Sequence, residues 1–218
     1  LGLVGSEMCI RDRLKDQYIT SKDGYTLSSA KAMQLDIISS MVAQGWKRPA
    51  YFAITIPDEY YSYFENQDGG YKFTTSAGMA YALTPINMLA YKSVGSGYTD
   101  KAYRNITEHY RWGGLDKATP GNVPYYDETA ARMVNSTRIS IVEAAQNLIK
   151  EAEMAADLKE HNDSLKVDVP ARVMTDGFIA DRYNKARTLL HLMEQKLPWF
   201  AVNASFSIIE DTASAYFT

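Results

Sequence analysis

One long apolar stripe most constrains what this chain can fold into. Between residues 128 and 160, apolar side chains recur every three or four positions, at Val134, Ile141, Ala145, Leu148, Ala152 and Ala155, with Val142 and Ile149 beside them. This is the period of an α-helix with one buried face. Asp127 precedes the stripe and predicts an N-cap, and the polar residues 161–164 end it. The sequence therefore predicts a helix over residues 128–160.

Shorter patterns predict further elements on both sides of this helix. A helix is predicted over residues 28–44, with a buried stripe of Met33, Ile37 and Met41 that Leu35, Ile38 and Val42 widen, and Gly45 suits the left-handed position after its end. The remaining predictions are a strand over 50–56 between two prolines, a strand region over 73–84 broken near Gly78, a helix capped by Thr99 that reaches Arg111, and helices over 175–195 and 198–216.

The order of these elements predicts an α+β fold with two regions. Residues 14–120 are expected to form a small sheet packed with helices, and residues 121–218 an α-helical hairpin array. Such an array resembles tetratricopeptide repeats, although the sequence has no self-similarity with a period of about 34 residues.

The first 13 residues do not fit this organisation. The run from Leu3 to Arg13 resembles the translation of a transposon-type sequencing adapter, so we exclude residues 1–13 and expect the native chain to begin near Leu14, with its own N-terminus missing. Cys9, the single cysteine, lies in this segment, and its exclusion removes disulfide and thiol chemistry from the rest of the chain.

Composition and motifs exclude several functional classes. A net charge of −3 gives no reason to expect nucleic acid as a partner. His109, His161 and His191 lack the spacing of metal ligands. A nucleophile elbow and a phosphate-binding glycine loop are both missing from the sequence. We therefore expect no catalytic residue, no metal site and no cofactor in this chain.

Adjacent acidic pairs do not change that expectation, because neighbouring side chains do not converge on one bond. Asp127 is interpreted as a helix cap, and Glu128 pairs with Arg132 four residues later. The pairs Asp58-Glu59 and Glu210-Asp211 are interpreted as solvated.

Two short segments carry the candidate contact residues. Trp46, Lys47 and Arg48 follow a helix end, where cations favour the helix dipole and the indole can anchor the helix to the sheet. The alternative is an anion site, since arginine binds phosphate with two hydrogen bonds. The tyrosines Tyr60, Tyr61 and Tyr63 belong either to a loop packed on the sheet or to a contact surface for glycans or a membrane interface.

Trp112 is a further candidate for glycan contact. It stands directly before Gly113-Gly114, and the simpler interpretation is that this sequence ends a helix.

Seven motifs in order carry a resemblance to a known family. They are Leu35-Asp36-Ile37-Ile38, Trp46 to Ala53, Gly78 to Ile86, Thr99-Asp100, Trp112 to Asp116, Tyr126-Asp127-Glu128 and Arg132-Met133. Together they resemble the C-terminal region of bacterial multi-pass membrane proteins related to protein O-mannosyltransferases. Ala77 and Ala82 depart from that pattern, because acidic and basic residues are expected at their positions, and the chain after Asn162 matches poorly.

The resemblance implies a parent glycosyltransferase that uses a lipid-linked sugar donor and a protein acceptor. The implied parent carries its catalytic acid in an early loop between membrane helices, so no catalytic residue is transferred to this chain. The chain would be a non-catalytic domain on the periplasmic face of the inner membrane, in contact with the rest of the membrane protein and with acceptor proteins or glycans. Two alternatives stay open: a stand-alone helical-repeat binding module and a carbohydrate-binding lipoprotein fragment.

Overall fold

The computed structural model describes residues 29–66, 69–165 and 167–217, and these form two compact units. The first unit extends to Thr75 and resumes over Tyr81–Ser93, and the second contains Ser76–Ala80 and the chain from Val94 onward. Helices and a small antiparallel sheet make the fold α+β, as predicted. Residues 1–13 lie outside the described residues.

Among its described residues, the first unit combines one helix with two small sheets. Its helices and strands are α2 (Ser29–Ala43), β1 (Ala50–Ala53), β2 (Glu65–Asn66), β3 (Tyr71–Lys72), β4 (Thr74–Ser76) and β5 (Ala80–Leu83), with 3₁₀ turns at Asp58–Tyr60, Ser62–Phe64 and Tyr91–Ser93. One sheet has the order β1-β5-β4. The other pairs β2 with β3 in antiparallel register, with Glu65 opposite Lys72 and Asn66 opposite Tyr71.

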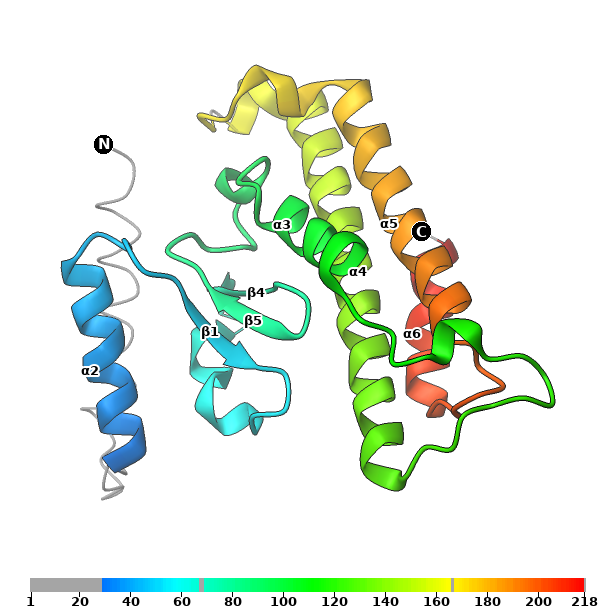
Figure 1. The fold of residues 1–218 in the computed structure, drawn as a ribbon. Coiled ribbons are helices and arrows are strands. Elements are labelled where there is room, and N and C mark those ends of the chain that lie inside the picture. The colour runs from blue at the N-terminus through cyan, green and yellow to red at the C-terminus, as the bar shows by residue number, and fades with distance from the viewer. Residues whose placement is uncertain (1–28, 67–68, 166, 218) are drawn as a thin grey trace. The chain divides into compact units, whose positions relative to one another are not determined.

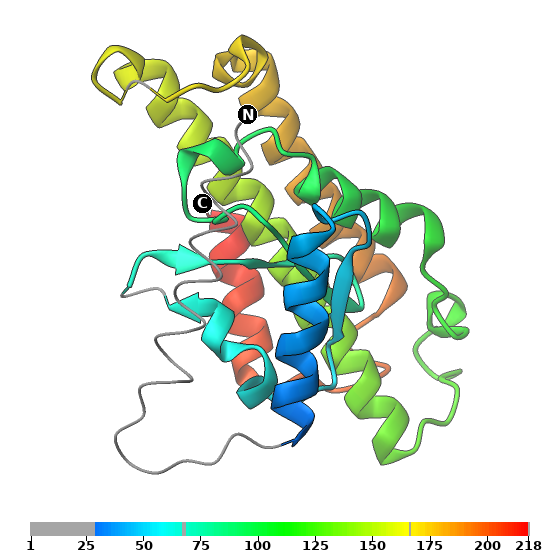
Figure 2. The ribbon, with the colours of Figure 1, turned by 90° about the vertical axis from the view of Figure 1, so that its left-hand side faces the viewer.

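Aromatic side chains dominate the core of this unit. Its buried members are Ile38, Phe52, Phe64, Tyr71, Phe73 and Leu83. Figure 2 shows α2 (blue) beside strand β1, and Ile38 and Val42 are the helix residues in this cluster. The predicted stripe of α2 is wrong in part, because Met33 is 67% exposed and Ile37 58% exposed. Two neighbouring faces of α2 carry apolar side chains, so periodicity alone did not decide which of these faces packs on the sheet.

The strand after α2 is shorter than predicted. It ends at Ala53, and the amide of Ile56 then donates to the carbonyl of Ala53 at 3.0 Å, which turns the chain ahead of Pro57. At the preceding junction Gly45 has φ 65°, as predicted, and Trp46 has φ 58°, which is unusual for a bulky residue.

The predicted break near Gly78 is confirmed as the turn between β4 and β5. The amide of Ala77 donates to the carbonyl of Ala80 at 2.8 Å across this turn. Gly78 has φ 100°, and a Cβ at this position would lie 2.9 Å from the hydroxyl of Tyr110. Glycine is therefore required twice, by the backbone conformation and by the close ring.

The second unit is helical. Its elements are α3 (Tyr98–Arg104), a π-helical turn (Asn105–His109), α4 (Glu128–Leu165), α5 (Asp176–Lys196) and α6 (Phe206–Phe217), with 3₁₀ turns at Leu115–Lys117 and Ala171–Met174. Figure 1 shows α4 and α5 side by side in opposite directions, with α6 against them. The whole predicted stripe of α4 is buried. The backbone leaves helical geometry at His161, where the sequence predicted a break.

Two predicted helix boundaries in this unit are wrong. The helix after Thr99 ends as an α-helix at Arg104 and continues as the wider π-helical turn to His109 instead of reaching Arg111. The last helix begins at Phe206 and not at Pro198.

Arg138 explains why residues 198–205 are not helical. Its side chain is fully buried, and its Nη atoms donate to the carbonyls of Val202, Leu197 and Pro198 at 2.8, 3.0 and 3.1 Å. Its guanidinium also lies 4.6 Å from the centre of the Trp199 ring. These carbonyls bind Arg138 instead of helical amides, so the guanidinium fixes the α5–α6 loop. Burial lowers the pKa of Arg138 to about 10, a value at which the group is still charged at neutral pH.

Arg138→Leu should lower the free energy of unfolding by about 3 kcal/mol, because it leaves buried carbonyls without donors. Arg138→Lys should recover less than half of that loss, since an ammonium lacks the planar fork that serves several carbonyls. Urea denaturation measures both. Arg132→Leu is the matched control on the same helix, because Arg132 is exposed and its pair with Glu128 spans 3.8 Å. Full recovery of stability in Arg138→Lys would contradict the role given to the planar guanidinium.

Trp46→Ala should destabilise the protein by about 2 kcal/mol, because the half-buried ring packs on the aromatic core of the first unit. Trp46→Gly should be about 1 kcal/mol less harmful, since glycine accepts the positive φ without strain. The exposed Lys47 should tolerate alanine within about 0.5 kcal/mol. Thermal unfolding of the three variants tests this order, and equal stability of the Trp46 variants would contradict the strain argument.

Candidate functional site

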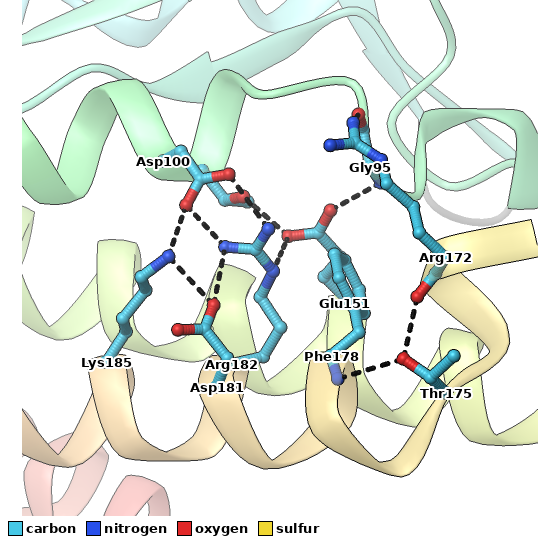
Figure 3. A network of polar contacts seen from close by, with 10 residues as sticks. Gly95, Asp100, Glu151, Arg172, Thr175, Phe178, Asp181, Arg182 and Lys185 are labelled. Atoms are coloured by element: carbon cyan, nitrogen blue, oxygen red, sulfur yellow. Dashed lines mark hydrogen bonds and ion pairs between the residues drawn. The ribbon is translucent and has the colours of Figure 1, made fainter. Parts of the chain in front are cut away.

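Charged side chains converge at one place in the second unit, between α3, α4 and α5 (Figure 3). Asp100 comes from the first turn of α3 and Glu151 from the middle of α4. Arg182 and Lys185 come from one face of α5, together with Asp181. We call these five residues the charged network.

Arg182 lies at the centre of the charged network, with a side chain only 4% exposed. Its two Nη atoms donate to the two carboxylate oxygens of Asp100, at 2.5 and 2.8 Å. Its Nε lies 3.2 Å from Oε2 of Glu151, and its guanidinium stacks 4.3 Å from the centre of the Phe178 ring. A planar guanidinium can serve two carboxylates at once in this way, whereas an ammonium cannot.

Lys185 adds a second cation to the network. Its Nζ lies 2.7 Å from Oδ1 of Asp100 and 2.8 Å from Oδ2 of Asp181. Asp100 thus accepts from two cations and is held between them.

Glu151 connects this cluster to the chain that leads into α3. Its side chain is 7% exposed; Oε1 accepts from the amide of Gly95 at 2.7 Å, and Oε2 accepts from the hydroxyl of Thr99 at 2.5 Å. The prediction that Thr99 caps α3 is therefore wrong. Gly97 is the capping residue, and the hydroxyl of Thr99 is used by Glu151 instead.

The electrostatics keep the network charged. Burial alone would raise the pKa of Asp100, but the hydrogen bonds and charges of Arg182 and Lys185 outweigh it and lower that pKa to about 2. The same carboxylate raises the pKa of Lys185 against the effect of burial. A carboxylate with such a pKa stays ionised near neutral pH and is a weak base, so Asp100 is unsuited to acid–base catalysis. The network is a clamp that holds residues 95–100 to α4 and α5.

The residues that the sequence selected for contacts do not join this network. In the first unit Trp46 packs on the aromatic core, and Lys47 and Arg48 are exposed. Tyr60, Tyr61 and Tyr63 are half-buried in the same unit.

The rings of two of these tyrosines lie against the core of the first unit. Tyr61 lies 5.1 Å from Tyr81 and 6.1 Å from Phe52, and Tyr63 lies 4.4 Å from Phe64, measured between ring centres. Trp112 belongs to the second unit, where it is half-buried 5.6 Å from Tyr110. The packing interpretation describes these rings better than the interpretation as a contact surface.

The acidic pair at the start of α4 has the structural role that the sequence predicted. Oδ1 of Asp127 accepts from the amide of Ala130 at 2.7 Å, and Glu128 pairs with Arg132 across one turn. Among the described residues, no group of three or more histidine, cysteine or acidic side chains could hold a metal ion.

Sequence reasoning missed the buried charges themselves. Arg138 lies on the apolar stripe of α4, between Val134 and Ile141, and Glu151 directly precedes Ala152 on the same stripe. A charged residue on a buried stripe requires a partner, and this requirement was the sequence signal that could have identified the site. The partner of Glu151 and Asp100, Arg182, is distant in sequence, and no local pattern identifies it.

Comparisons with known protein families, curated proteins and solved structures find no match to this chain. Within the part of the chain that the structure describes, no helix is both long enough and apolar enough to cross a membrane.

Asp100→Asn should destabilise the protein by about 1–2 kcal/mol at pH 7, after allowance for the solvent exposure of Asp100. The pKa of Asp100 is about 2 in the folded protein against an ordinary value of 3.8, so its contribution is complete above pH 3.8 and is lost as the pH falls toward 2. Urea denaturation between pH 7 and pH 2 should show the gap to wild type closing over that window.

Asp176→Asn is the matched control for this measurement, because Asp176 pairs with Lys159 at an 88% exposed position. It should change stability by less than about 0.5 kcal/mol at any of these pH values. A gap for Asp100→Asn that stays constant down to pH 2 would contradict the ion-pair origin of the effect.

Proposed function

We propose that this chain is a non-catalytic domain of a membrane glycosyltransferase of the protein O-mannosyltransferase-like type, located on the periplasmic face of the inner membrane. In this proposal the domain contacts acceptor or partner proteins, and the chemistry takes place in another part of the parent protein. One observation carries the proposal: the motifs of the resemblance coincide with residues that hold the fold together.

The coincidence is clearest at three of these motifs. Thr99 and Asp100 bind Glu151 and Arg182 in the charged network. Gly78 forms the β4–β5 turn, and its carbonyl accepts from the hydroxyl of Ser140. Asp127 caps α4.

Residues of this kind identify a fold, and their carboxylates have structural roles, since Asp100 is ion-paired and Asp127 caps a helix. A shared scaffold with its catalytic groups elsewhere is what an accessory domain of a larger enzyme requires. The motif residues therefore support membership of the same domain type and argue against a catalytic role for this region.

The helical unit supports the contact role. An antiparallel pair, α4 and α5, followed by a third helix packed on it, is the arrangement from which helical-repeat arrays are built. We therefore include a tetratricopeptide-like array in the proposal. The same observation also favours the runner-up, a stand-alone helical-repeat binding module with no membrane parent.

The purified 218-residue chain should transfer no sugar from a polyprenyl-linked donor to a peptide acceptor. Each carboxylate of the charged network is paired with a cation, and the proposed parent supplies the catalytic acid from a region outside this chain. Release of free polyprenyl phosphate, followed by chromatography, measures transfer. Turnover above the level of a heat-denatured sample would contradict the non-catalytic role.

The genomic DNA upstream of the Leu14 codon separates the competing proposals. Several apolar segments of about 20 residues in the same reading frame support the membrane glycosyltransferase. A start codon close to Leu14, with no export signal after it, supports the stand-alone module. A signal peptide with a lipid-attachment cysteine supports a carbohydrate-binding lipoprotein.

A further inference from the structure

A groove in the helical unit is separate from the charged network. It lies between α4, α5 and α6 and has a volume of about 440 Å³, within the range of small-molecule sites. Ile149, Leu190 and Ala215 form an apolar floor, and each is at most 7% exposed.

Two tyrosines and two polar side chains line the groove above this floor. Tyr183 and Arg187 belong to α5, as does His191, and Tyr216 belongs to α6. The tyrosines are 36% and 37% exposed, so their rings keep free surface for a ligand. We call these four residues the groove edge.

The groove edge is organised by contacts among its own members. Nε of Arg187 donates to Nε2 of His191 at 3.3 Å, and the rings of His191 and Tyr216 lie 5.8 Å apart. Glu194, one turn further along α5, has Oε2 3.9 Å from Nδ1 of His191. Burial together with the hydrogen bond to Glu194 raises the pKa of Tyr216 to about 12, so its hydroxyl stays protonated.

The charges at this edge decide which ligand fits. Arg187 is a cation and Glu194 an anion, so their charges offset each other beside the groove. A phosphate or carboxylate ligand would gain from Arg187 but would be repelled by Glu194. A purely apolar ligand would remove water from these polar groups and return no hydrogen bonds. The combination favours a neutral ligand with an apolar face and several hydroxyl groups.

We propose that the groove binds a neutral sugar ring, with the C–H face of the ring against Tyr183 or Tyr216 and its hydroxyls toward Arg187, His191 and Glu194. Aromatic rings supply apolar area with little loss of conformational freedom, and the charged groups supply both donors and acceptors. The inference goes beyond the proposed function, because it rests on the groove alone and requires no membrane parent.

The test is a titration of the full-length protein with neutral sugars. Mannose, glucose, galactose, N-acetylglucosamine and their short oligomers are added in turn, and saturation-transfer NMR reports which protons contact the protein. At least one neutral sugar should bind with a Kd below about 10 mM, the range in which a single shallow site is measurable. The C–H protons of one ring face should receive the strongest transfer.

Variants then locate the bound sugar. Tyr183→Ala or Tyr216→Ala, whichever removes the ring in contact with the sugar, should weaken binding about tenfold, which corresponds to ~1.4 kcal/mol. Glu194→Gln should weaken it less, because an amide oxygen still accepts a hydrogen bond. Tyr125→Ala is the matched control, since Tyr125 is a 92% exposed tyrosine of the same unit outside the groove lining. Circular dichroism confirms that each variant keeps its helical content.

Several outcomes would overturn the proposal. No neutral sugar binds below about 10 mM, or binding is equally affected by Tyr125→Ala. Tighter binding of galacturonate than of galactose would indicate an anion site at Arg187. Binding of an amphipathic helical peptide without any sugar would indicate a protein-docking groove. A failed sugar titration leaves the glycosyltransferase-domain proposal standing, because that proposal is tested by the upstream DNA.

Discussion

The arrangement of helices in the second unit depends on the ion pairs that the buried guanidinium of Arg182 makes with Asp100 and Glu151. A charge with a 4% exposed side chain is strongly destabilising unless it is paired, and Arg182 is paired with carboxylates from two other helices, α3 and α4. Such a pair adds little net stability compared with apolar packing, yet it tolerates only one arrangement of its partners. We infer that the charged network sets the position of α3 along α4 and α5, a choice that apolar contacts alone leave open.

Helix α4 uses the same device at a second point. Arg138 and Glu151 lie thirteen positions apart on one buried stripe, roughly 20 Å along the axis. Arg138 holds the α5–α6 loop, and Glu151 holds the segment that enters α3. Between them Ile141, Ala145 and Leu148 pack without directional preference. The apolar stripe therefore supplies burial, and the two charges select which segments occupy it.

This division of labour explains what could be predicted from the sequence. The stripe of α4, the cap at Asp127 and the turn at Gly78 follow from local patterns, and the structure confirms all three. The charged network joins Asp100 to Arg182, 82 residues later, and a single sequence contains no local trace of such a pairing.

Two errors have the same cause. Thr99 is a residue type that often caps helices, but its hydroxyl donates to Glu151 instead. Residues 198–205 are predicted to be helical, but the carbonyls of Pro198 and Val202 accept from Arg138. Tertiary hydrogen bonds override local preference in both places.

The aromatic residues show why clustering in sequence is a poor guide to a ligand surface. Tyr61 and Tyr63 lie within one short segment and turn toward Phe52 and Phe64, because adjacent rings bury most area against one another. Tyr183 and Tyr216 are isolated in sequence, and each is held on a helix with its ring partly free. Helices fix side-chain positions more closely than loops do, so a contact site is better supported there. The groove edge is therefore a better candidate for a contact surface than the tyrosine-rich segment, for which a contact surface was one of two interpretations.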